Sequence, residues 1–218
     1  MNAPFFHFRN DPSKSENAIR FSICTNQIKF KQGLDPIEQS KAFQLGRPLD
    51  IEASLVPILA GSSGDIRPVM IQDGVFTTKK ISEGLLQALG DLVQVFEVSD
   101  ASQSIAQGLP QKLTGLLRDS HILAGPRNDS RLEDIWLINL TRSVDCIDWM
   151  RSDVEVWPDD PRRIRYLEKI VINKGSVTGH DQLFRLAGSA NIIIASAYGR
   201  EAMLRAGVPP EYFGTEIF

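Results

Sequence analysis

The sequence predicts an α+β protein, with a mixed or antiparallel sheet and a few short helices in a single compact domain. Two similar strand–helix–strand units and a hairpin between them lead to this prediction. The composition agrees, because 218 residues with 42% hydrophobic side chains can bury a sizeable core. We expect residues 1–73 to form an irregular, strand-containing N-terminal subregion beside an α+β domain at residues 74–218.

The overall charge and the cysteine content argue against several classes of function. Lys and Arg number 24 against 27 Asp and Glu, so the net charge is −3 and suggests no basic face for nucleic acid. Cys24 and Cys146 are too few for a disulfide framework or a four-cysteine zinc site. Residues 1–8 lack the basic start of a signal peptide, and no apolar run approaches the roughly 18 residues that cross a bilayer. The sequence therefore predicts a cytoplasmic protein without a nucleic-acid or membrane partner.

The N-terminal elements are short and separated by polar turns. Residues 19–23 alternate between apolar and polar side chains, as a half-buried strand does, and residues 28–31 could be the hairpin partner of that strand. Residues 49–53 could form a strand or a loop. A loop of glycines and serines at residues 61–65 then precedes a strand at residues 69–71.

The first strand–helix–strand unit has clear signals at its ends. Residues 74–78 are strand-like, and Ser82 is a good N-cap for the helix that follows. Gly90 is placed to end this helix, because glycine adopts the left-handed backbone at low cost. Residues 92–98 form the second strand. The apolar face of the helix comprises three leucines at helical spacing, Leu85, Leu86 and Leu89.

The unit that closes the chain follows the same plan. Residues 192–195 form a continuous apolar strand, Ser196 is the candidate cap, and Gly207 ends a helix at residues 201–206. The helix matches residues 83–88 in character, position by position. The match indicates either two similar supersecondary pieces of one domain or a chance resemblance.

The middle of the chain supplies further strands. Residues 135–140 are predicted to form a strand, and residues 154–157 should pair with residues 164–167 in a hairpin. The intervening residues 158–161 are prolines and aspartates, which favour turns.

A last strand before the closing unit is predicted at residues 183–186. Side chains alternate along a strand, so Leu183 and Arg185 share one face and Phe184 and Leu186 share the other. We expect Phe184 and Leu186 to lie in the core.

The usual sequence motifs for catalysis, metals and cofactors are lacking. Residues 61–64 lack the Lys-Ser/Thr of a phosphate-binding loop, and no Gly-x-Ser-x-Gly motif marks a nucleophile. Cys146 lies in an apolar stretch and is predicted to be a small buried hydrophobe. The histidines are far apart and unpaired at helical spacing: His7, His121 and His180. The sequence therefore predicts no cofactor and no bound metal.

Two carboxylates could still contribute to a dispersed catalytic site. Asp145 and Asp148 are three residues apart and could share a helix face, as paired acid–base groups can. The alternative is that one carboxylate forms a cap and the other an ion pair with Arg142 or Arg151. His180 lies in a predicted loop, where we expect a turn or a satisfied hydrogen bond rather than a metal ligand.

A cluster of aromatic and charged residues at the hairpin tip is a candidate partner-binding site. It comprises Trp157, Asp159, Asp160, Arg162 and Arg163, followed by Arg165. Tryptophan and arginine are enriched among the residues that contribute most to binding at protein interfaces. The alternative is a solvated turn with Trp157 tucked into the core.

Several stretches of the chain together resemble a known family. A strand followed by a Val-Asp-x-x-Asp motif covers residues 136–148, and a Leu-Phe-Arg-Leu-x-Gly motif covers residues 183–188. A strand, a helix, a glycine and a final aromatic residue follow at residues 192–213, and residues 75–96 fit an earlier strand–helix–strand. In this order the stretches resemble the immunity protein 11 family, formerly a domain of unknown function, which is found beside polymorphic toxins in bacteria. The resemblance extends over residues 74–218.

The resemblance implies a non-enzymatic protein that binds and neutralises a cognate toxin encoded nearby. We expect it to act by occlusion, covering the active site of the toxin or holding the toxin in an inactive shape. An alternative from another class is a small hydrolase or transferase with a dispersed site at Asp145, Asp148 and His180. A third alternative is a structural or regulatory module that recognises some other protein.

Overall fold

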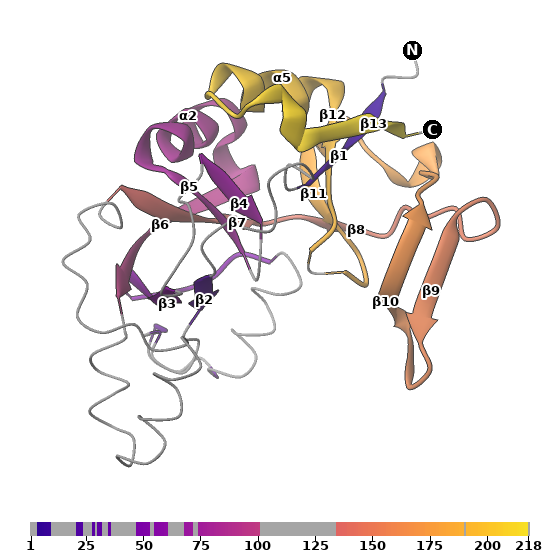
Figure 1. Cartoon of the computed structure of the whole chain (residues 1–218), viewed down its shortest axis with the longest axis horizontal. Coiled ribbons are helices and arrows are strands. Elements are labelled where there is room, and N and C mark those ends of the chain that lie inside the picture. Colours follow the sequence, from indigo (N-terminus) through magenta and orange to yellow (C-terminus); the bar gives the residue numbers. More distant parts are fainter. Residues whose placement is uncertain are drawn as a thin grey trace.

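The computed structural model has the α+β architecture that the sequence predicts (Figure 1). Two large sheets carry most of the described strands, the two α-helices of the described residues lie over them, and a two-stranded hairpin extends on one side. The residues that the structure describes are 4–9, 21–23, 28, 30, 31, 35, 47–52, 55–60, 68–71, 74–100, 134–189 and 191–217. The predicted loop at residues 61–65, residues 19–20 of the first predicted strand, Cys24 and His121 lie outside them.

The larger sheet has six strands among the described residues, and neighbouring strands run antiparallel except for one pair. In spatial order the strands are β2 (Phe21–Ile23), β3 (Leu55–Ala60), β6 (Val93–Asp100), β7 (Ile135–Leu140), β5 (Val75–Thr78) and β4 (Val69–Ile71). The parallel pair is β3 and β6. The strands predicted between residues 69 and 98 and at residues 135–140 are confirmed, with shifts of a residue or two at their ends.

The smaller sheet joins segments from opposite ends of the sequence. Its strands, in spatial order, are β13 (Phe213–Ile217), β1 (Phe5–Phe8), β12 (Ile193–Ser196), β11 (Leu183–Leu186) and β8 (Ser143–Val144). β1 lies between β12 and β13 and runs antiparallel to both, with Phe5 opposite Ser196 on one side and Ile217 on the other. No local pattern predicts a strand at residues 5–8, because its partners come from the other end of the chain.

The two predicted strand–helix–strand units share one topology. In the first unit α2 (Lys79–Leu89) connects β5 to β6, and in the second α5 (Ala197–Arg205) connects β12 to β13. The two strands of each unit are parallel and flank a third, antiparallel strand, which is β7 in the first unit and β1 in the second. The helices approach closely, since a Cβ atom at Gly84 would lie 2.9 Å from the Cβ of Ala206. The shared topology favours two similar pieces over a chance resemblance.

The first helix begins earlier than the sequence predicts. α2 starts at Lys79 after Thr78, so the prediction of Ser82 as the N-cap is wrong. The Ser82 side chain is buried in the first turn, where its hydroxyl lies 2.6 Å from Oγ1 of Thr77. Ser82 therefore packs α2 against Thr77 of β5 and does not cap the start of the helix.

The apolar face of α2 differs from the prediction in one residue. Leu85 and Leu89 are buried as expected, with Ile81 one turn before them, whereas Leu86 is 46% exposed. Residues four apart lie on one face of a helix, and a neighbour in sequence is rotated by about 100°. Leu86 therefore faces away from the core.

The other predicted helix ends are confirmed. Gly90 follows α2 with φ of 55°, and Gly207 lies just beyond α5. Ser196 caps α5, because its hydroxyl accepts a hydrogen bond from the N–H of Gly199 at 3.1 Å. This helix also begins earlier than predicted, at Ala197. Short 3-10 turns, η3 (Gly90–Leu92) and η6 (Pro210–Tyr212), lead from the helices into β6 and β13.

The partner of the strand at residues 21–23 is a further correction. β2 pairs with β3, with Phe21 opposite Ala60, and not with residues 28–31. Phe30 forms an isolated bridge to Ile51 instead. β6 already holds β3 in the sheet, so the other edge of β3 is a fixed partner for β2. An isolated two-stranded hairpin between residues 21–23 and 28–31 would be only marginally stable.

Hydrophobic clusters lie on both faces of the two sheets. The first cluster lies beneath α2 and α5 and draws on both sheets, for example through Val75 and Ile193. The second covers the opposite face of the larger sheet, around Phe76 and Leu137, and the third covers the opposite face of the smaller sheet, around Ile194. The first cluster therefore joins the two sheets under the helical layer.

The register predicted for residues 183–186 is confirmed, but both faces of this strand are buried. Phe184 and Leu186 lie in the third cluster, whereas Leu183 lies in the first. Arg185 is also buried, and burial lowers the pKa of its guanidinium to about 10. β11 is thus a central element of the core.

Replacing Phe184 with alanine should destabilise the protein strongly. The ring is fully buried and makes an edge-to-face contact with Phe5 at 6.3 Å between centroids. Deletion of such a side chain costs about 3–5 kcal/mol in the free energy of unfolding, measured by chemical denaturation. Leu86→Ala, on the exposed side of α2, is the control and should change stability by less than about 1 kcal/mol. A Phe184→Ala protein as stable as the control would show that the ring is not in the core.

Candidate partner-binding surface

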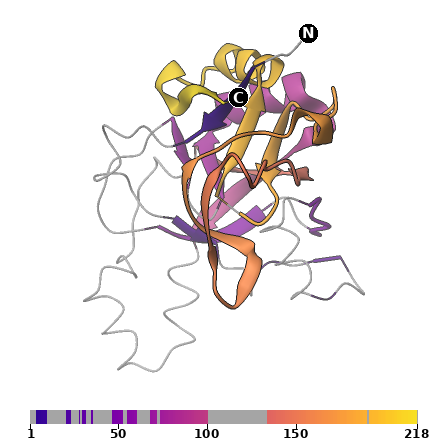
Figure 2. The ribbon, with the colours of Figure 1, turned by 90° about the vertical axis from the view of Figure 1, so that its right-hand side faces the viewer.

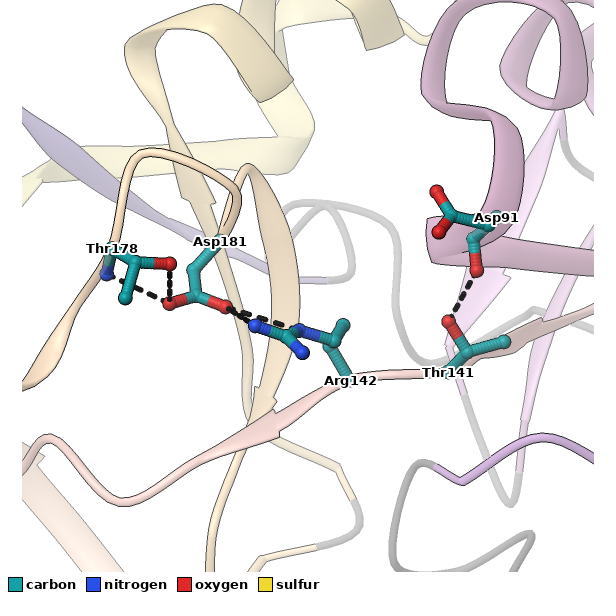
Figure 3. A network of polar contacts seen from close by, with 5 residues as sticks. All are labelled: Asp91, Thr141, Arg142, Thr178 and Asp181. Atoms are coloured by element: carbon teal, nitrogen blue, oxygen red, sulfur yellow. Dashed lines mark hydrogen bonds and ion pairs between the residues drawn. The ribbon is translucent and has the colours of Figure 1, made fainter.

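The chain passes from the larger sheet to the smaller one within two residues, Thr141 and Arg142 (Figure 3). These residues follow β7 and precede β8. The Thr141 hydroxyl donates to the carbonyl oxygen of Asp91 at 2.6 Å, and its N–H donates to the carbonyl oxygen of Leu92 at 3.1 Å. Thr141 is therefore fixed to the turn that follows α2.

Arg142 fixes the crossing to the smaller sheet. Its Nη2 and Nε atoms donate to Oδ1 of Asp181 at 2.7 and 3.1 Å (Figure 3). Oδ2 of Asp181 accepts from the N–H and the hydroxyl of Thr178, both at 2.8 Å. The carbonyl oxygen of Arg142 also accepts from the N–H of Arg185 in β11 at 2.9 Å. Side chain and backbone together attach β8 to β11.

Asp181 is a buried carboxylate with a full set of donors. Burial by itself raises the pKa of this carboxyl, but the hydrogen bonds from Thr178 and the ion pair with Arg142 outweigh burial and hold the pKa below its ordinary value of 3.8. Of the two arginines considered as partners for Asp145 or Asp148, Arg142 therefore pairs with Asp181 instead. A buried charge needs a partner far more than an exposed one does, and β8–β11 pairing brings Asp181 within reach of Arg142.

The hairpin predicted from the sequence is confirmed as β9 (Asp153–Trp157) and β10 (Asp160–Lys169). It lies beside the smaller sheet and faces the viewer in Figure 2. Trp157 pairs with Asp160, so the turn consists of residues 158 and 159. A short 3-10 turn, η5 (Lys174–Ser176), follows β10.

The hairpin is fixed to the segment that follows β11 and is closed at its own base. Gly188 follows β11 with φ of 84°, a backbone conformation that favours glycine, and its carbonyl oxygen accepts from the N–H of Ile164 at 3.0 Å. At the base, the Ser152 hydroxyl accepts from the N–H of Val171 at 2.9 Å and donates to its carbonyl oxygen at 3.3 Å. Val154 and Ile164 pack on the third cluster. These contacts hold the hairpin in one orientation.

Trp157 lies on the outer surface of the hairpin against two arginines. Its side chain is 39% exposed, and the Cζ atoms of Arg163 and Arg165 lie 5.4 and 5.6 Å from the ring centroid. Arg165 also donates to a carboxylate oxygen of Glu155 at 2.9 Å. In the described part of the chain, Arg163 forms no ion pair. The two cation–π contacts restrict the freedom of the exposed ring.

Irregular pairing in the hairpin creates this cluster. Ile164 pairs with Val156 and Tyr166 pairs with Glu155, so Arg165 is an extra residue in β10. A bulge of this kind redirects the neighbouring side chains, and both Arg165 and Tyr166 are exposed. Bulged strands are poor templates for pairing with another strand. The hairpin therefore exposes side chains rather than a regular strand edge.

The predicted site residues whose side chains are described are all exposed: Trp157, Asp159, Asp160 and Arg163. Trp157 is thus not tucked into the core. The side chain of Arg162 lies outside the described residues. Sequence reasoning missed Glu155 and Tyr166. The alternation of β9, which places residues 153, 155 and 157 on one face, could have indicated Glu155, but the bulge that exposes Tyr166 has no such signal.

The residues of the dispersed-site hypothesis do not form an acid–base pair among the described residues. Asp145 and Asp148 lie in irregular segments rather than on a helix. Asp148 Oδ1 accepts from the N–H groups of Met150 and Arg151 at 3.2 and 3.3 Å, and Oδ2 lies 3.8 Å from Nη1 of Arg151. Asp148 therefore caps a turn and forms the expected ion pair with Arg151. Asp145 and His180 are exposed and make no hydrogen bond to each other or to Asp148.

Two other ionisable groups on or near the smaller sheet are uncharged at neutral pH. Cys146 is buried, and burial together with the nearby Asp145 and Asp181 raises the pKa of its thiol to about 12. Burial and the neighbouring charge of Arg9 lower the pKa of His7 to about 4. Within the described residues no group of three His, Cys, Asp or Glu side chains is placed to hold a metal ion. No helix there has the length and apolar character needed to span a membrane.

The part of the chain that carries the crossing, the hairpin and β11 also matches a known family. The model of the Immunity protein family (Imm11) matches residues 122–215. The resemblance predicted from the sequence is confirmed over these residues. No curated protein matches the chain in a sequence comparison.

Motif residues of the Imm11-matching segment have clear structural roles. Val144 of the Val-Asp-x-x-Asp motif lies in β8 and pairs with Leu186 of β11. Asp148 of the same motif caps the turn before the hairpin. Gly188, at the end of the Leu-Phe-Arg-Leu-x-Gly motif, holds β10 through its carbonyl oxygen. These motif residues therefore position β8, the turn before the hairpin and β10.

Replacing Asp181 with asparagine should destabilise the protein more at pH 7 than at pH 3. The folded-state pKa lies below 3.8, so the carboxylate contributes stability above that pH and loses the contribution as the pH falls below it. We expect a loss of about 1–2 kcal/mol at pH 7, because charged acceptors make the stronger hydrogen bonds. Urea unfolding at pH 7 and pH 3 measures the difference. The exposed Asp145→Asn is the matched control, and an equal effect of both substitutions would contradict the role of the Arg142–Asp181 pair.

Proposed function

We propose that this protein binds and neutralises a cognate toxin encoded nearby. The observation that carries the proposal is the match of residues 122–215 to the Immunity protein family (Imm11). Neutralisation by binding requires a rigid surface that fits one partner and buries about 800 Å² on each side. The hairpin supports this requirement, since hydrogen bonds close its base, a further one joins β10 to Gly188, and Val154 and Ile164 pack on the third cluster.

We infer that the hairpin tip docks on the toxin and that the protein acts by occlusion, covering the active site or holding the toxin inactive. Trp157 is the anchor of this surface, because its contacts with two arginines leave little freedom to lose on binding. The charged rim comprises Asp159, Asp160, Arg162 and Arg163. Rim charges mainly steer encounter and select the partner. Arg163, which has no ion-pair partner among the described residues, favours an acidic group on the toxin.

The direct test is expression of the neighbouring toxin gene in a sensitive host, with and without this protein. We expect the host to grow only when both proteins are present. The purified proteins should also co-elute as a complex in size-exclusion chromatography. A folded protein that neither protects the host nor binds the toxin would overturn the proposal.

Asp145→Asn and His180→Ala should leave protection of the toxin-expressing host intact. Neither side chain is buried, and neither belongs to an acid–base pair among the described residues. Growth of the host measures protection, and a thermal melt of each purified variant shows that it folds. Loss of protection in a variant with an unchanged melt would favour the hydrolase or transferase hypothesis, or place that residue in the interface.

Trp157→Ala should weaken binding of the purified toxin by about 2 kcal/mol or more, the threshold for residues that dominate an interface. Isothermal titration calorimetry measures the affinity. The melting temperature should change little, because the ring is partly exposed and outside the three hydrophobic clusters. Tyr198→Ala, an exposed aromatic on α5, is the matched control and should leave affinity unchanged.

Charge reversal tests the rim of the same surface. Replacing Arg162 and Arg163 with glutamate should chiefly slow association, and the effect should shrink as salt increases. Stopped-flow mixing with the purified toxin measures the rate. A Trp157→Ala variant that melts early but binds normally would place the binding face elsewhere.

A further inference from the structure

The turn that precedes β9 exposes two large apolar side chains in succession. Met150 is 97% exposed and Trp149 is 48% exposed. Contact of apolar surface with water is unfavourable, and a cluster of exposed apolar side chains is typical of an interaction site. Neither side chain belongs to the three hydrophobic clusters of the described residues.

Polar contacts hold this turn in a defined shape. The Asp148 carboxylate caps it through two backbone N–H groups, and the Asp148 carbonyl oxygen accepts from the N–H of Ser152 at 2.9 Å. The N–H of Asp148 donates to the carbonyl oxygen of Val171 at 2.9 Å, which attaches the turn to the segment after β10. The turn therefore presents Trp149 and Met150 from a fixed backbone, and ordering it on binding costs little.

The turn and Trp157 lie at opposite ends of β9. The strand has five residues, which corresponds to a length of about 16 Å. The Ser152–Val171 hydrogen bond closes the base of the hairpin, and the hydrogen bond from Ile164 to Gly188 holds β10 against the segment after β11. Two of the three tryptophans of the chain are therefore exposed at the two ends of one fixed strand.

We propose that the Trp149–Met150 turn is a second anchor for the same toxin and enters an apolar pocket on its surface. This inference rests on the proposed function. A stable interface uses about 20–30 residues on each side, more than the hairpin tip can offer. The turn exposes two further apolar side chains beside the hairpin, and it lies in the segment that matches the immunity family. The toxin then presents two apolar pockets, one for each anchor.

Serine substitutions test the second anchor. The variants are Met150→Ser, Trp149→Ser and the double substitution, and calorimetry with the purified product of the neighbouring toxin gene measures their affinities. We expect the double variant to bind at least tenfold more weakly than the wild type. The matched controls are Leu86→Ser on α2 and Tyr198→Ser on α5, which remove exposed apolar side chains from the helical layer. Both controls should bind within twofold of the wild type.

Oxidation of Met150 gives a readout that requires no substitution. Hydrogen peroxide converts an accessible methionine to the sulfoxide, so Met150 should react quickly in the free protein. The bound toxin should slow this reaction at least fivefold, as followed by mass spectrometry of proteolytic peptides. Met203 is buried in the first cluster and is the internal reference, whose slow reaction the toxin should leave unchanged.

The outcomes separate this inference from the proposed function. If the wild type binds the toxin while the double variant binds equally well and Met150 stays reactive in the complex, the second anchor is overturned and the proposed function stands. If the wild type does not bind the toxin at all, both are overturned. Self-association that Met150→Ser abolishes, with toxin affinity unchanged, would assign the turn to a second copy of the chain and also overturn the second anchor.

Discussion

The structure depends on the crossing of the chain between its two sheets at Thr141 and Arg142. β7 is a central strand of the larger sheet and β8 an edge strand of the smaller one, so any slip at these two residues would displace everything that follows. The Thr141 side chain holds one side of the crossing and the Arg142–Asp181 pair holds the other. The turn capped by Asp148 and the hairpin come next in the chain, and their positions are set from this point.

Elements with local signals could be predicted from the sequence. The units around α2 and α5, the cap at Ser196 and the hairpin are encoded within short windows of periodicity and turn residues. The predictions fail where a distant segment decides the outcome. Ser82 has a buried partner on β5, β2 pairs with β3, and Arg142 finds a carboxylate 39 residues away. No pattern within a window of a few residues contains these partners.

The candidate surface could be predicted only in part, for a related reason. Residue types alone indicate Trp157 and its charged neighbours, but they leave open whether the ring is buried or exposed. Its position depends on the bulges of β10, which bring Arg165 to the ring and turn Tyr166 outward. No sequence pattern indicates the exposure of Met150 either, since it depends on the turn that the Asp148 carboxylate caps.

The position of β1 between β12 and β13 affects when the protein can act. Segments from opposite ends of the sequence must meet before the smaller sheet is complete, and this sheet supports the hairpin. Contacts between segments so far apart in the chain form slowly. During translation the supporting sheet stays incomplete until residues 213–217 leave the ribosome. Under the proposed function, this predicts a delay between synthesis and toxin binding, so that a folded reserve is needed before a toxin becomes active.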